Sequence, residues 1–306
     1  MRDALSEALV RAASLDERVL LLTGDHGYAL FDDFRSAFPD RFVNAGVAEQ
    51  NMVGMAAGLA KAGFRPIVYG LSSFVPLRVL EQIKMDIAHD QLPVLLLGDG
   101  AGFVYSFLGT SHQSLEDIAC TRVIPHLSVL SPADRFELTA CMELAMAHEG
   151  PTYLRVGKAD LGDVHAGAVE FGLGDLLQVF GPRHAELCMI ATGSMVSTAV
   201  RLADGQLSGA AVWSAPSIKP IDESLVADIC RRSGTVIVIE EHSVAGGLGS
   251  LIAEIAAQTA PVRVLRIGSN DRFSEFCGSY DYLLREHELD DVSVARRISD
   301  FLQGRT

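Results

Sequence analysis

The sequence predicts an α/β fold with two doubly wound domains: a domain with a largely parallel sheet, followed by a smaller one. Short, continuously apolar runs alternate with longer segments of helical periodicity along the 306 residues. Such runs are typical of strands buried on both faces of a parallel sheet, whose faces are covered by helices. At roughly 150 residues per domain, the length also indicates two domains.

The first half contains five of the expected strands and five of the expected helices. The apolar runs predict strands at 19–22, 66–69, 93–97, 127–130 and 152–156. Apolar residues at helical spacing predict helices at 3–14, 49–62, 77–90, 115–121 and 133–148. Residues 158–174 are rich in Gly and Asp and interrupt the alternation. We therefore expect the domain boundary in this segment.

The second half repeats the alternation on a smaller scale. Strands are predicted at 187–192, 209–213, 235–240 and 262–266, and helices at 195–202, 221–233, 247–258 and 292–302. The second unit is therefore also α/β.

Composition excludes several classes of protein. The net charge of −14 disfavours binding to nucleic acid or to an anionic membrane surface. No run of 18 apolar residues is long enough to span a membrane, and the first 15 residues indicate an amphipathic helix instead of a signal peptide. Five widely spaced cysteines without a CxxC motif predict reduced, buried thiols in a cytoplasmic protein, at positions 120, 141, 188, 230 and 277.

One segment, RFVNAGVAEQNMVGMAAGLAKAGF at 41–64, combines a short strand with a helix that begins near Glu49. Glu49 then lies in the first helical turn at the carboxyl end of a strand, where open α/β sheets place ligands. The residues alone leave two interpretations open: Glu49 complements the helix dipole, or it binds a ligand. Gly54 and Gly58 allow close backbone approach, either within the core or at a subunit interface.

Two further segments carry candidate ligand-binding side chains. Phe74 is either a core residue or a surface on which a planar ring stacks. The loop GDGAGFVYSFLGTSHQSLE at 98–116 contains His112, which is either an acid or base or a polar helix start. Its GDG triplet is not followed by paired asparagines, so we assign no metal-ligand role to Asp99 and predict no metal site in this chain.

The segment EEHSVAGGLGS at 240–250 joins a strand to a helix and is rich in glycine. Such a turn can hold a phosphate. It matches neither GxGxxG nor the P-loop, so a structural turn with helix capping is favoured.

Several motifs, taken in order, resemble the C-terminal half of transketolases, and most closely the separate C-terminal subunit of split transketolases. They are GVAEQNMVGMAAGLA at 46–60, LEQIKMDIA at 80–88, SHQSLEDIA at 111–119, LSPAD at 130–134, PTYLRVGK at 151–158 and EEHSVAGGLGS at 240–250. The resemblance runs nearly end to end. It implies a pyrimidine-binding domain at 1–163 and a transketolase C-terminal domain at 164–306.

The resemblance also implies a cofactor and a partner. This chain would contact thiamine diphosphate on its pyrimidine side only, and an N-terminal transketolase subunit would hold the diphosphate and Mg²⁺. Self-association through the pyrimidine domain would complete an α2β2 assembly. The implied reaction transfers a two-carbon ketol unit from a ketose donor to an acceptor, so the substrate is a sugar-type small molecule.

The family motifs imply roles for individual residues. Glu49 matches the glutamate that hydrogen-bonds the aminopyrimidine ring and activates the cofactor, and His112 matches a histidine near the reacting donor carbon. The implied cofactor contacts are Asp25, Glu49, Phe74 and Leu71. The implied substrate contacts are Arg2, His112, Lys158, Leu108 and Gly100.

Four of these positions depart from the family pattern. Leu71 replaces a second Phe, and Gly100 replaces a histidine that binds the substrate phosphate. Leu108 replaces an aspartate that contacts a donor hydroxyl, and Lys158 replaces an arginine. Because these changes alter what the pocket can hydrogen-bond, we expect a substrate that is less phosphorylated or more apolar than xylulose 5-phosphate.

Two alternatives stay open at this point. One is a thiamine-diphosphate acyl-forming enzyme subunit that passes its two-carbon unit to a carrier thiol. The other is a non-catalytic regulatory subunit, which the changes at Gly100 and Leu108 favour and the presence of Glu49, Phe74 and His112 disfavours.

Overall fold

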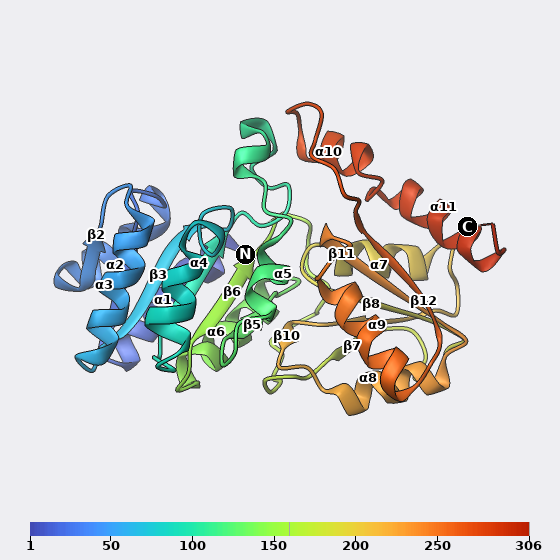
Figure 1. The fold of residues 1–306 in the computed structure, drawn as a ribbon, viewed down its shortest axis with the longest axis horizontal. Helices are drawn as coiled ribbons and strands as arrows, with labels where there is room; N and C mark the ends of the chain where they lie inside the picture. Colours follow the sequence, from blue (N-terminus) through green and yellow to red (C-terminus); the bar gives the residue numbers. More distant parts are fainter. Residues whose placement is uncertain (159, 306) are drawn as a thin grey trace.

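The structure, a computed structural model, describes residues 1–158 and 160–305 and contains two sheets that lie side by side (Figure 1). In spatial order, the first sheet consists of β10 (Ser217–Lys219), β5 (Ser128–Leu130), β6 (Thr152–Val156), β4 (Leu95–Asp99), β3 (Arg65–Leu71), β1 (Val19–Thr23) and β2 (Phe42–Asn44). The second consists of β12 (Arg263–Ser269), β11 (Thr235–Ser243), β8 (Leu187–Ala191), β9 (Ala211–Ser214) and β7 (Leu177–Phe180). All neighbours are parallel except β10 with β5 and β7 with β9.

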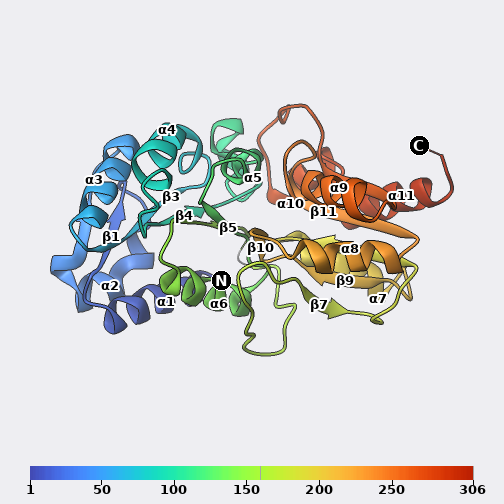
Figure 2. The same cartoon turned by 60° about the horizontal axis from the view of Figure 1, so that its bottom comes forward.

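Helices cover both faces of the first sheet (Figure 2). One face carries α1 (Arg2–Leu15), α2 (Asp32–Ala37) and α6 (Arg135–Ala147), and the other carries α3 (Glu49–Lys61), α4 (Leu80–Gln82) and α5 (Asp117–Arg122). In the second unit, α8 (Glu223–Arg232) packs with α9 (Leu248–Thr259). On the same sheet, α7 (Met195–Asp204) packs with α11 (Asp291–Leu302), and residues of α10 (Tyr280–Glu286) belong to the same hydrophobic core. The predicted fold class, two doubly wound α/β units with mostly parallel strands, is confirmed.

Each of the nine predicted strands is present, with ends that differ by a few residues from those predicted. The regular helix predicted at 77–90 is wrong: the segment consists of a 3₁₀ turn (Leu77–Val79), the short α4 and a π-helical turn (Ile83–Ala88). Apolar periodicity indicates a helical segment but does not distinguish hydrogen-bond spacings. The elements α2, α10, β7 and β10 were not predicted.

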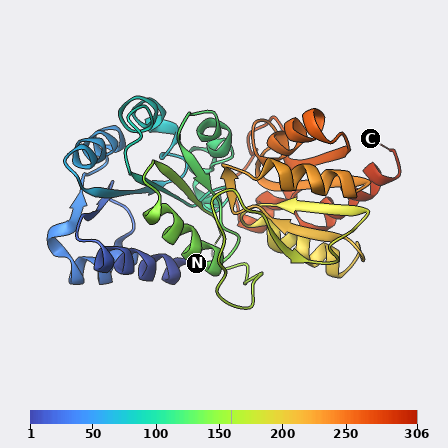
Figure 3. The same cartoon turned by 90° about the horizontal axis from the view of Figure 1, so that it is seen from below.

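Strand β10 joins the two units, since it follows β9 in the chain but pairs with β5 of the first sheet. Ser217 is opposite Leu130 and Lys219 is opposite Val129 in this antiparallel pair. The chain start also lies near the junction of the units (Figure 3). The junction is therefore built from backbone pairing as well as side-chain packing.

A buried ion pair links the first sheet to β11. Nε of Arg155 donates to Oδ2 of Asp117 at 2.8 Å, and both side chains are at most 2% exposed. The Tyr153 hydroxyl donates to the same oxygen at 2.8 Å, and Nη2 of Arg155 donates to the backbone oxygen of Glu241 at 2.7 Å. Removing one member would leave buried polar groups without partners, which is more costly than losing an exposed ion pair.

We therefore expect Arg155→Met to lower the free energy of unfolding by about 3–5 kcal/mol. Arg11→Met is the matched control, because Arg11 and Glu143 form an ion pair whose side chains are 62% and 54% exposed. Exposed pairs contribute little. Urea denaturation followed by circular dichroism measures both variants, and equal midpoints for the two would contradict this ranking.

The segment between the units is anchored to α6. Backbone N–H groups of Val164 and His165 donate to Oδ2 of Asp134 at 3.0 and 2.9 Å, and Nε2 of His165 lies 2.9 Å from Oε1 of Glu137. The hydrogen bond with Glu137 raises the pKa of His165 above its ordinary value. Because the pKa is raised in the folded state, the interaction of protonated His165 with Glu137 stabilises the protein fully at low pH. This contribution is lost as the pH rises through the raised pKa.

Accordingly, the stability difference between the wild type and His165→Gln should be largest near pH 6 and should shrink by pH 9. The comparison of urea midpoints at the two pH values tests this, with Glu137 left unchanged in both proteins. A difference that grows with pH would show that the neutral imidazole, and not the imidazolium, is the stabilising form.

Candidate functional site

Glu49 begins α3 at the carboxyl edge of the first sheet, as the sequence predicts, and is only 3% exposed. Its Oε1 lies 3.0 Å from Nη1 of Arg78. Among the residues that the structure describes, none donates a well-oriented hydrogen bond to this buried oxygen. The carboxyl group is therefore shielded from water and retains hydrogen-bonding capacity.

Arg78 links Glu49 to Phe74, and His112 lies beside the Phe74 ring. The guanidinium carbon of Arg78 is 3.9 Å from the centroid of the Phe74 ring, and the rings of His112 and His26 are 5.3 and 6.3 Å from it, centroid to centroid. Arg78 thus shows that a planar group bearing N–H donors fits against Phe74 while reaching Glu49. Sequence reasoning missed Arg78 and His26, although Arg78 follows Phe74 by four residues in a helical segment.

Asp25 lies in the turn after β1 and adopts a left-handed backbone conformation, with φ of 65°. Its Oδ1 accepts hydrogen bonds from Nδ2 of Asn44 at 3.0 Å and from the Tyr28 hydroxyl at 2.9 Å. These hydrogen bonds, that of Asn44 first, lower the pKa of Asp25. Asp25 is thus an exposed, ionised group held at the sheet edge.

A cavity of about 790 Å³ opens at the carboxyl ends of β1, β3, β4 and β6. It collects most of the predicted substrate residues, together with one predicted cofactor residue: Arg2, Leu71, Leu108, His112 and Lys158. Residues that the sequence did not single out for binding also line it, among them His26, Tyr69, Asp99 and Tyr105. Tyr69 and Asp99 could have been found from their positions in the sequence, because both lie near the carboxyl ends of adjacent parallel strands.

Gly100 lies behind the wall of this cavity. Its φ is +74°, and a Cβ atom there would lie 1.9 Å from Cε2 of Tyr105. The Tyr105 ring therefore occupies the space that a side chain at position 100 would need, and only glycine meets both requirements.

Lys158 is not free to bind a ligand with its full charge. Its Nζ lies 2.5 Å from Oδ1 of Asp160 and 5.5 Å from the centroid of the Tyr280 ring. The apolar side chain of Leu108 is 56% exposed on the same loop as His112.

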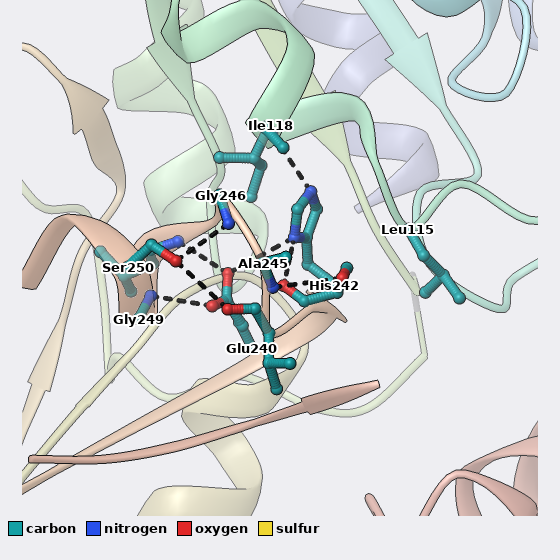
Figure 4. Close-up of polar contacts among 12 residues, drawn as sticks. Leu115, Ile118, Glu240, His242, Ala245, Gly246, Gly249 and Ser250 are labelled. Carbon is teal, nitrogen blue, oxygen red and sulfur yellow. Dashed lines mark hydrogen bonds and ion pairs between the residues drawn. The ribbon is translucent and has the colours of Figure 1, made fainter. Parts of the chain in front are cut away.

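The glycine-rich segment 240–250 is a structural turn, as favoured (Figure 4). The Glu240 carboxylate accepts hydrogen bonds from the backbone N–H groups of Leu248 and Gly249, both at 2.8 Å. These are the first N–H groups of α9, where a bound phosphate would lie. Because the chain's own carboxylate occupies this position, the segment is not a phosphate cradle.

The neighbouring residues of β11 hold the loop that carries His112. Both oxygens of the Glu241 carboxylate are bonded: one accepts from the Phe103 backbone N–H at 2.6 Å, and the other from the hydroxyls of Tyr280, also at 2.6 Å, and Ser194. Nε2 of His242 accepts from the Ala119 backbone N–H at 3.3 Å (Figure 4). The second unit therefore fixes the position of the loop from both of its ends.

Cysteines and metal ligands add little to the site. Cys141, Cys188 and Cys230 are buried, but Cys277 is exposed, so the expectation of five buried thiols is wrong. Cys277 lies in a loop near Gly109. Within residues 1–158 and 160–305, no group of three or more His, Cys, Asp or Glu side chains could hold a metal ion. No helix in those ranges is both long and apolar enough to cross a membrane.

Comparisons with known proteins identify the family of this chain. Residues 1–163 match the family model of the transketolase pyrimidine binding domain, and residues 181–293 match that of the transketolase C-terminal domain. The chain is 34% identical over 302 residues to the 6-deoxy-6-sulfo-D-fructose transketolase subunit SqwH of Clostridium sp. (strain MSTE9), covering 97% of this chain and 92% of the relative.

Other relatives agree. The chain is 32% identical over 308 residues to a subunit of the apulose-4-phosphate transketolase of Phocaeicola vulgatus, covering 99% and 97% of the two proteins. A solved structure of a split gene transketolase, described as an inactive β4 tetramer, superposes with a TM-score of 0.88 at 32% identity over 100% of this chain and 98% of that one. This chain belongs to the transketolase family and is the C-terminal subunit of a split, thiamine-diphosphate-dependent transketolase.

Proposed function

We propose that Glu49 is the catalytic carboxyl group in the transfer of a two-carbon ketol unit from a ketose donor to an acceptor. The observation that carries this proposal is a nearly fully buried carboxyl group beside an aromatic face, with one oxygen that accepts no oriented hydrogen bond from a described residue. Such a group is placed to share a proton with a ring nitrogen.

The residues fit the pyrimidine side of thiamine diphosphate. Arg78 already brings a planar, nitrogen-bearing group against Phe74 and within 3.0 Å of Glu49. When bound, the cofactor supplies the carbon centre that carries the two-carbon unit. In this scheme Phe74 and Leu71 contact the ring, Asp25 lines the cofactor site, and Glu49 holds a proton at the ring nitrogen.

The cavity residues would bind the substrate. In this proposal His112 lies near the reacting carbon, where its ring can hydrogen-bond a substrate oxygen. Arg2 supplies positive charge, and Lys158 supplies a positive charge that Asp160 partly neutralises. Leu108 and Gly100 supply none. Because the Leu108 side chain is exposed and apolar, and the Tyr105 ring excludes any side chain at position 100, we propose a substrate less phosphorylated or more apolar than xylulose 5-phosphate.

A partner chain would complete the site. We propose that an N-terminal transketolase subunit holds the diphosphate and Mg²⁺, that two copies of each chain form an α2β2 assembly, and that the units of this chain divide at residues 163/164. Two relatives are named as subunits, and the similar split gene transketolase is inactive as a tetramer of β chains, which supports the need for a partner. The charge of −14 supports a small-molecule substrate rather than nucleic acid or a membrane, and we propose a cytoplasmic location.

Glu49→Gln should reduce turnover by at least about 100-fold, since glutamine keeps the shape but cannot exchange the proton. The rate of two-carbon transfer by the chain mixed with its partner measures this. Glu81→Gln is the matched control, because Glu81 is exposed on nearby α4. Subunit assembly, followed by gel filtration, should be unchanged in both. Normal turnover of Glu49→Gln would exclude Glu49 from catalysis and favour a regulatory subunit.

The reaction product distinguishes the transferase from the acyl-forming enzyme. We expect the chain, co-purified with the product of the adjacent gene and supplied with thiamine diphosphate, Mg²⁺, a ketose and an aldose, to release a new ketose. Mass spectrometry of the products detects it. A thioester formed on an added carrier thiol, without a new ketose, would show the acyl-forming activity instead.

A further inference from the structure

Asp99 ends β4 inside the cavity and is held by two tyrosines. The hydroxyls of Tyr69 and Tyr105 each donate to Oδ2 of Asp99 at 2.8 Å. Burial, followed by the adjacent Asp99 charge, raises the pKa of both tyrosines well above its ordinary value. Both hydroxyls therefore remain protonated donors, and Asp99 is fixed as the acceptor.

The second carboxylate oxygen is left for a ligand. Both tyrosine hydroxyls bond to Oδ2, and no residue within the described ranges donates a hydrogen bond to Oδ1 of Asp99. Asp99 is part of the wall of the same cavity as His112 and Arg2. An ionised carboxylate oxygen accepts hydrogen bonds from hydroxyl or ammonium groups and has none to donate.

The charges around the cavity do not favour a phosphate there. Lys158 is paired with Asp160. Among the wall residues that the structure describes, the other Lys or Arg side chain is Arg2, and the same wall contains the carboxylate of Asp99. The formal charges of these four wall side chains cancel, and the N-terminal ammonium group adds a positive charge that acts on Asp160. A phosphate bound beside Asp99 itself meets a fixed negative charge. Sugar hydroxyl groups, in contrast, meet an oriented acceptor.

We propose that Asp99, positioned by Tyr69 and Tyr105, is a substrate-binding residue that selects hydroxyl- or amino-bearing sugars and rejects a phosphate group at this point of the cavity. The proposal rests on the proposed function, because it names the substrate class of the same site. Gly100 is part of the arrangement, since any side chain there would displace Tyr105 from Asp99. Two tyrosines, a glycine and an aspartate thus form one binding feature.

The test replaces Asp99 by its neutral isostere. In the reconstituted enzyme, Asp99→Asn should raise KM for unphosphorylated ketose donors about tenfold, equivalent to 1.4 kcal/mol, and lower KM for phosphorylated ones. Asp90→Asn is the matched control, because Asp90 pairs with Lys61 outside the cavity and its loss changes the net charge equally. Tyr105→Phe, which removes one donor and keeps the ring, should shift both constants in the same directions by less.

A second measurement does not depend on catalysis. Inorganic phosphate, titrated into the full chain and followed by NMR, should bind Asp99→Asn at least about tenfold more tightly than the wild type or Asp90→Asn. Equal phosphate affinity and equal KM ratios in the Asp99 and Asp90 variants would overturn the proposal. If no variant transfers a two-carbon unit but the phosphate difference persists, the proposed function fails while the selectivity of Asp99 stands.

Discussion

The arrangement of the whole site depends on the buried contact between the two units, where Arg155 and Asp117 form an ion pair and Arg155 also donates to the backbone of Glu241. The Glu241 side chain in turn accepts from the backbone of Phe103, at the start of the loop that carries His112. Asp117 pairs with Arg155 within the first unit, whereas the bonds from Arg155 and Phe103 to Glu241 form only when the units are docked, so docking and loop position are coupled. This gives the second unit a role in the site although its residues scarcely enter the cavity.

The buried glutamates of this chain separate structural from functional carboxylates. Glu240 accepts from two N–H groups of α9, Glu241 from a backbone N–H and two hydroxyls, and Glu137 from the Ala133 backbone N–H while it pairs with His165. In each, internal donors reach both oxygens, which offsets the cost of burial. Among the residues that the structure describes, Glu49 has an ion pair with Arg78 but no oriented donor for the buried oxygen. Glu49 thus differs from these three buried glutamates in having an oxygen that a ligand can complete.

The sequence predicted the parallel sheets because buried strands have continuous apolar runs, and it placed Glu49 at the carboxyl end of a strand, where open α/β sheets hold ligands. It could not predict β10, since such a short strand carries no period and its partner strand lies far earlier in the chain. The sequence also could not predict the hydrogen bond from Tyr105 to Asp99. This hydrogen bond depends on the left-handed backbone of Gly100, which local sequence permits but does not require. The assigned roles of Glu49 and His112 stay predictions, whereas the contacts of Arg78 with Glu49 and Phe74, and of Phe74 with His112, are observed.

The changes at Gly100 and Leu108 have different physical consequences, although both depart from the same family segment. Leu108 is exposed and lines the cavity, so it presents an apolar surface there. Gly100 has an indirect effect. Because it has no side chain, the Tyr105 ring packs over the backbone at this position and the Tyr105 hydroxyl reaches Asp99. At position 100, where the resemblance implies a histidine in the family, this chain thus has no side chain, and at position 99 it has an oriented anion. We therefore expect that one added charge at position 100 would not by itself create a phosphate site, because a side chain there first has to displace Tyr105.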